Sequence, residues 1–123
     1  MQTVAMAEEP LHAEIDRLVN AAAGGSVAAQ STDAEFLRRV YLDLLGVVPT
    51  YDEAITFLGD ASADKREKLI ARLLDHPRFG VHQSDVWDMI YFGRNPPSYG
   101  TRDRDGFKNW LRDQVNNWPG KTF

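Results

Sequence analysis

A helix start followed by a wide apolar stripe, over residues 32–46, constrains this chain more than any other feature. Thr32 and Glu35 form a capping box, in which an N-cap hydroxyl and a carboxylate three residues later satisfy the first backbone N–H groups. Two apolar rows follow at helical spacing, Phe36-Val40-Leu44 and Leu37-Tyr41-Leu45, and Gly46 ends the pattern. A stripe of this width predicts a helix that lies against the centre of a core.

Helical spacing of apolar residues recurs along the rest of the chain. Besides this helix we expect others at about 11–23, 51–58, 63–75, 80–92 and 107–118, each bounded by glycine, proline or a capping residue. Thr50 and Glu53 form a second capping box, which opens the helix at 51–58. On the helix at 63–75 we expect an outer, solvated face formed by Asp64, Lys65, Lys68 and Arg72. No stretch alternates with period two for long enough to predict a sheet.

These patterns predict an all-α fold, a compact irregular bundle of about six helices. We expect its core to contain Phe36, Val40, Leu44, Leu73, Ile90, Trp110 and Leu111. A chain of 123 residues, of which 43% are hydrophobic, is long enough for one core and too short for two ordinary domains. We therefore expect a single helical domain over residues 11–123.

Charge and composition exclude several classes of function. A formal net charge of -4 offers no basic surface for a phosphate backbone, so nucleic acid is not an expected partner. No apolar run approaches the roughly 20 residues that span a bilayer. Without cysteine there is no disulfide, no thiolate metal site and no covalent haem attachment motif.

Residues 1–10 form a tail that we interpret as the possible remnant of an export signal. Ala5-Met6-Ala7 has the small-x-small pattern that precedes cleavage by signal peptidase, and Glu8 would open the mature chain. No apolar segment stands before this pattern. Chance matches in alanine-rich sequence are the alternative.

Three charged residues on the most apolar predicted helix stand out. Arg39 and Asp43 are four residues apart, a spacing at which side chains on a helix can touch, and Arg38 precedes them. Guanidinium groups in this position could bind an anion or a glycan carboxylate. We favour the structural interpretation, in which Asp43 accepts hydrogen bonds that fix the turn into Gly46 and Val47.

Metal and haem sites are weakly indicated. His82 and Asp85 share one face of the expected helix at 80–92, whereas Asp88 is six residues from His82 and lies off that face. We expect solvated side chains here and no metal site. His76, His82 and Met89 have the chemistry of axial haem ligands, but we expect no cofactor in this domain.

The segment Arg94–Asp105 reads as a loop and carries the residues that could bind a sugar. Planar hydrogen-bonding side chains stand near an aromatic residue of the last helix, in the set Arg94, Asn95, Tyr99, Arg102 and Trp110. Hydrolysis would also need two acidic groups across a cleft, for which Asp103, Asp105 and Asp113 are available. The simpler interpretation is a tethering loop.

Three segments together resemble a known family. They run from Phe36 to Thr50, from Leu69 to Gly80, and from Trp87 to Leu111. The residues that carry the motif are Arg38, Arg39, Asp43, Gly46, Pro49, Thr50, Pro77, Gly80 and Trp87. The chain is similar to the non-haem domain of unknown function that accompanies cytochrome c-type domains in large exported planctomycete proteins (PSCyt-type).

The resemblance covers about Ile15 to Phe123, and one departure stands within it. Many members have an aspartate and an arginine where this chain has Met89 and Phe92, so the chain looks closer to the branch with a Gly93-Arg94-Asn95 loop. The resemblance implies export to the periplasm or cell envelope, and a chain that forms the N-terminal part of a longer protein. It implies no established reaction.

We therefore expect an interaction or scaffold module of a larger exported protein rather than an enzyme. Its expected partners are other domains of the same parent chain, where haem would be bound, and a polysaccharide is the further candidate. The alternative is a glycan-binding or glycan-processing domain that uses the Arg94–Asp105 loop.

Overall fold

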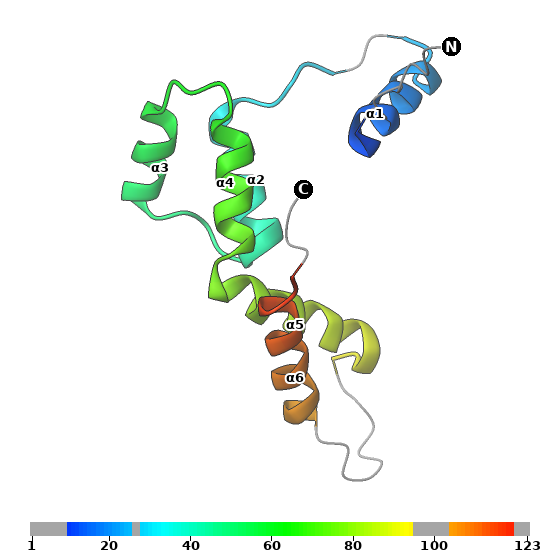
Figure 1. The fold of residues 1–123 in the computed structure, drawn as a ribbon, viewed down its shortest axis with the longest axis vertical. Coiled ribbons are helices and arrows are strands. Elements are labelled where there is room, and N and C mark those ends of the chain that lie inside the picture. Colours follow the sequence, from blue (N-terminus) through cyan, green and yellow to red (C-terminus); the bar gives the residue numbers. More distant parts are fainter. Residues whose placement is uncertain (1–9, 26–27, 95–103, 120–123) are drawn as a thin grey trace, which may run out of the picture. The chain divides into compact units, whose positions relative to one another are not determined.

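The computed structural model of the chain describes residues 10–25, 28–94 and 104–119. Over these residues the fold is all-α, as the sequence predicts, with six helices and no strand (Figure 1). Their bounds are α1 Leu11–Ala22, α2 Asp33–Leu45, α3 Tyr51–Gly59, α4 Lys65–Leu74, α5 Pro77–Phe92 and α6 Arg104–Asn116. None of these helices is both long and apolar enough to span a bilayer.

The chain divides into two units, Met1–Gln30 with α1 and Ser31–Phe123 with the other helices. In the first unit, α1 keeps the predicted apolar stripe, and its largest members are exposed, namely Leu11, Ile15, Leu18 and Val19. Arg17 donates two hydrogen bonds to Glu14 on the polar side of this helix. The single domain expected over 11–123 stays a prediction.

In the second unit, α2 contacts α3, α4 and α5. The core lies among α2, α3 and α4 and consists of Leu37, Tyr41, Leu45, Phe57, Leu69 and Leu73. Of the two apolar rows on α2, Leu37-Tyr41-Leu45 fills the centre, while Phe36, Val40 and Leu44 are partly buried at its edge. Leu73 is fully buried, as expected.

Both capping boxes form as the sequence predicts. Thr32 Oγ1 accepts a hydrogen bond from the backbone N of Glu35, and the Glu35 carboxylate accepts one from the Thr32 backbone N. Thr50 and Glu53 repeat this reciprocal pair at the start of α3. These bonds explain why each helix begins at its predicted residue.

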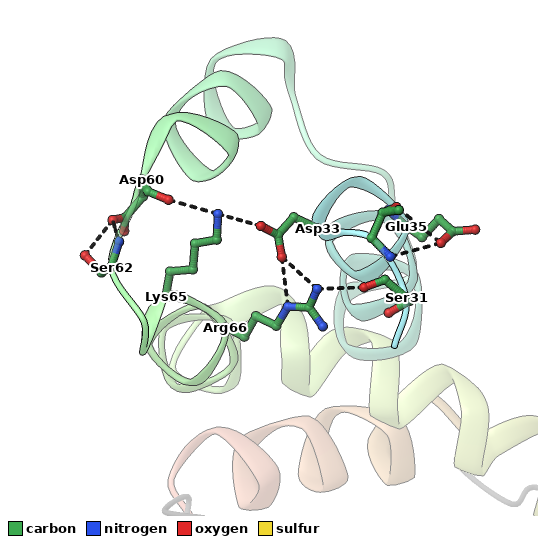
Figure 2. A network of polar contacts seen from close by, with 8 residues as sticks. Ser31, Asp33, Glu35, Asp60, Ser62, Lys65 and Arg66 are labelled. Atoms are coloured by element: carbon green, nitrogen blue, oxygen red, sulfur yellow. Dashed lines mark hydrogen bonds and ion pairs between the residues drawn. The ribbon is translucent and has the colours of Figure 1, made fainter. Parts of the chain in front are cut away.

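A polar network joins the beginnings of α2 and α4 (Figure 2). The carboxylate of Asp33 accepts from Lys65 Nζ at 2.6 Å and from Arg66 Nη2 at 2.7 Å, and these two cations hold the pKa of Asp33 below its ordinary value. The same nitrogens also donate to backbone oxygens, Lys65 to Asp60 and Arg66 to Ser31.

The network corrects the prediction that Lys65 lies on a solvated outer face. Its side chain is only 14% exposed, and its Nζ lies 5.0 Å from the centre of the Phe57 ring. Arg66 covers the Phe36 ring in the same way, at 4.6 Å. The two cations cover the edge of the core because their aliphatic stems are apolar and the charged ends reach Asp33.

The helices α5 and α6 pack side by side (Figure 1). Both begin three residues earlier than predicted, α5 at Pro77 and α6 at Arg104. Pro77 follows the end of α4 and is also the first residue of α5, because its fixed φ suits the first position of a helix. His76 caps α5, since its Nδ1 accepts a hydrogen bond from the Arg78 backbone N.

The prediction that Ile90 and Trp110 lie in the core is wrong. These side chains are 62% and 57% exposed. The buried residues of α5 are instead Gly80, Ser84 and Asp88, and α6 has no fully buried residue among those described. Periodicity identified an apolar side of each helix, but no described segment of the same unit covers it.

Candidate functional site

The second half of α5 and the adjoining part of α6 expose a group of large apolar side chains. We call this group the α5–α6 apolar surface and define it as Val86, Trp87, Met89, Ile90, Tyr91 and Trp110, whose exposures run from 38% for Val86 to 65% for Tyr91. Scattered apolar residues are normal on a protein surface, whereas a cluster of exposed apolar residues is typical of contact sites.

The surface exists because the side of α5 that faces α6 is narrow and consists of small and polar residues. Gly80, Ser84 and Asp88 follow one another at every fourth position, which places them on one side of the helix, and all three are buried. The Ser84 hydroxyl is satisfied locally, because it donates to the Val81 carbonyl at 2.7 Å. The bulky residues between these positions therefore point elsewhere.

A buried ion pair fixes the far end of α5 to the start of α6. Arg104 donates from Nε and Nη2 to the two oxygens of Asp88, both at 2.6 Å, while the Asp88 side chain is 8% exposed. The bonds from Arg104 hold the pKa of Asp88 below its ordinary value, so the carboxylate is ionised. Arg104 also donates to the Gly93 carbonyl at 3.3 Å, which ties the end of α5 to the same guanidinium.

A second clasp joins the other ends of the same two helices. The Asn116 amide accepts from the Gly80 backbone N and donates to the Pro77 carbonyl, each at 3.1 Å. A Cβ added at Gly80 would come within 2.6 Å of all three outer atoms of the Asn116 amide group. Gly80, a motif residue in the sequence, is therefore required for the close approach of α6.

Aromatic rings form a continuous row across the two helices. Trp87 and Tyr91 are stacked on α5 with ring centres 5.7 Å apart, and Tyr91 meets the edge of Phe107 on α6 at 5.9 Å. Phe107 in turn lies 6.2 Å from Trp110. Contacts of this kind orient the exposed rings and limit their freedom before any partner binds.

The acidic residues considered as metal ligands have other partners. Asp88 is held by Arg104, and Asp85 lies 2.5 Å from Lys108 Nζ. His82 faces α2, where a Cβ at Gly46 would overlap its ring. Among the described residues, no group of three or more His, Asp or Glu side chains could hold a metal ion. Of the candidate haem ligands, His76 caps α5 and Met89 is 54% exposed.

The turn after α2 is fixed from α5. Gly46 has a φ of +69°, in the left-handed region, and Arg78 Nε donates to the Leu45 carbonyl at 3.1 Å. Arg38, Arg39 and Asp43 are exposed on α2, and within the described part of the chain no hydrogen bond or ion pair is made by Asp43. Arg78 thus takes the part expected of Asp43.

Of the five residues proposed for a sugar site, the structure describes two. Arg94 is exposed just after the end of α5, and Trp110 belongs to the α5–α6 apolar surface. Asn95, Tyr99 and Arg102 lie outside the described residues, as does Asp103. The other acidic candidates, Asp105 and Asp113, are exposed on α6.

Sequence reasoning missed the surface as such, because it assigned Ile90 and Trp110 to the core. The sequence did contain a signal for this surface. Ser84 and Asp88 are polar, although they stand at positions of α5 that face the inside of the fold.

Comparison with known proteins gives a family and no function. No curated protein and no solved structure matches the chain. The family described as PSCyt2, protein of unknown function (DUF1549), matches residues 14–119, which include all of the α5–α6 apolar surface. Because this match covers most of the 123 residues, the chain belongs to the PSCyt2 family of unknown function.

Proposed function

We propose that this domain is a non-catalytic interaction module of a larger exported protein, and that it docks with a neighbouring domain of the same parent chain through the α5–α6 apolar surface. The periplasm or cell envelope is the proposed location, and any haem belongs to another domain. This setting is the one that the resemblance described above implies, and the family itself is described only as one of unknown function.

The observation that carries this proposal is the contrast between what α5 buries and what it exposes. Ser84 and Asp88 are buried, while Ile90 and Tyr91 are more than half exposed. Tryptophan, tyrosine and methionine, which make up four of the six residues of the surface, are enriched in protein interfaces. An uncovered group of these residues is expected to be removed from water by a partner.

Hydrogen exchange tests this proposal on the longer protein that would contain the domain. We expect backbone amides over residues 86–91 to exchange more slowly in the longer protein than in the 123-residue chain. The outer side of α3 is the internal control, because Ile55 and Leu58 are also exposed but lie outside the surface. Equal exchange over 86–91 in the two proteins would contradict docking there.

Glycan binding remains the second proposal, and one observation favours it. Trp110 is 57% exposed in the middle of α6 and is close in sequence to the Arg94–Asp105 segment. Sugars stack their C–H faces on such rings, while planar side chains such as Arg94 bind hydroxyl groups. A thermal-shift screen against acidic and neutral oligosaccharides should then give a rise in melting temperature that Trp110→Ala abolishes. A flat screen would remove this candidate.

A further inference from the structure

One side of α5 is covered along its first half and open along its second. Phe79 packs against the core and His82 lies against Gly46 of α2, so α2 covers this side near the start of the helix. Val86, Met89 and Ile90 continue the same side at spacings of three and four residues. The open part therefore prolongs a stripe that already serves as a helix-packing face in this fold.

The open surface has the size of a helix-mediated interface. Trp87, Tyr91 and Trp110 expose 41%, 65% and 57% of their areas. Because a fully covered aromatic side chain buries roughly 150–250 Å², these three alone leave about 300 Å² open. With Val86, Met89 and Ile90, which expose 38–62%, the surface makes up a large part of the roughly 800 Å² per partner of a standard interface.

No unpaired carboxylate of α5 obstructs contact between two such surfaces. Asp85 and Asp88 are both held by cations of α6, Lys108 and Arg104. Helical geometry also turns Asp88 about 200° away from Ile90, so the ion pair faces the inside of the fold. Two copies could therefore bring their Ile90 sides together without burying an unpaired carboxylate.

From this continuity, area and charge arrangement, we infer that a second copy of the chain covers the α5–α6 apolar surface when no neighbouring domain is present. The two copies meet symmetrically, with α5 of one against α5 of the other, because a self-complementary patch closes as a twofold dimer. The inference rests on the proposed function, since it names an occupant for the same surface.

Sedimentation or light scattering of the 123-residue chain over a concentration series tests the inference. We expect a reversible dimer that Ile90→Asp weakens at least about tenfold, because the symmetric contact would bury two unpaired carboxylates. The matched control is Ile55→Asp on α3, where the same residue type is 55% exposed and lies outside the surface. Circular dichroism and thermal melting verify that both variants are folded.

The outcomes distinguish dimerisation of the chain from docking with a neighbouring domain. A chain that sediments as a monomer at every concentration, or an Ile90→Asp variant that dimerises as strongly as the unmodified chain, would overturn the inference. If the chain is monomeric and residues 86–91 are protected in the longer protein, the proposed function stands without it. If the dimer forms through Ile90, the exchange comparison is made at a concentration where the 123-residue chain is monomeric. If the longer protein then adds no protection, the second copy stands and domain docking fails.

Discussion

The three helices α2–α4 and the pair α5–α6 are held together in different ways. In the first group the buried residues are large and apolar, with Leu69 and Leu73 completely enclosed. In the second, the buried residues of α5 are Gly80, Ser84 and Asp88, and polar clasps at the helix ends act together with ring contacts of Phe107. A helix pair that is fixed by hydrogen bonds at its ends leaves most of its apolar side chains available for a partner. A pair held together by apolar burial would use those side chains within the fold.

The largest expected effect belongs to the apolar group. Replacing Leu73, which is completely enclosed, by alanine should lower the free energy of unfolding by about 2–5 kcal/mol, through lost burial and the cavity left behind. At a protein concentration where the chain is monomeric, Ile90→Ala, at a site that is 62% exposed, should change it by less than about 0.5 kcal/mol. Denaturant unfolding of both variants measures the contrast. Similar losses for the two would show that Ile90 is covered, and the distinction between the regions would fail.

The next effect concerns the clasp between α5 and α6. Asp88→Asn removes the charge that Arg104 binds, and we expect a loss of about 1–3 kcal/mol because a buried charge-assisted pair is broken. Asp85→Asn is the matched control on the same helix, since its carboxylate is 54% exposed and its pair with Lys108 contributes roughly 0–1 kcal/mol. Equal losses of stability for the two variants in thermal unfolding would mean that the burial of Asp88 does not strengthen its ion pair.

The local features of the fold could be predicted from the sequence, and its long-range contacts could not. The capping boxes at Thr32 and Thr50 and the left-handed Gly46 lie within a few residues of what they determine, and each was found. The Arg78 bond to Leu45 spans 33 residues, and the Asn116 bond to Pro77 spans 39. No local pattern encodes which distant carbonyl a side chain will reach.

The candidate site illustrates the same limit. Helical spacing places Val86, Met89 and Ile90 on one side of their helix, but spacing does not tell whether anything covers that side. Asp88 was considered as a metal ligand because only its neighbours along the helix could be weighed. Its actual partner, Arg104, is 16 residues away and begins the next helix.

The smallest expected effect is a difference between the two regions in how their stability responds to acid. Arg104 holds the pKa of Asp88 below its ordinary value of 3.8, so the folded chain binds this proton less readily than the unfolded chain. The stabilisation from the pair is therefore complete above about pH 5 and is lost as the pH falls through the depressed folded pKa.

The difference in unfolding free energy between the unmodified chain and Asp88→Asn should consequently shrink as the pH falls below about 4. Other carboxylates with lowered pKa values, Asp33 and Glu53 among them, titrate in both proteins and cancel in this difference. The loss caused by Leu73→Ala should stay constant over the same range, because apolar burial has no titrating group. Denaturant unfolding across a pH series measures both differences, and a constant gap for Asp88→Asn down to the acid limit would show that the ion pair contributes no pH-dependent stability to α5–α6.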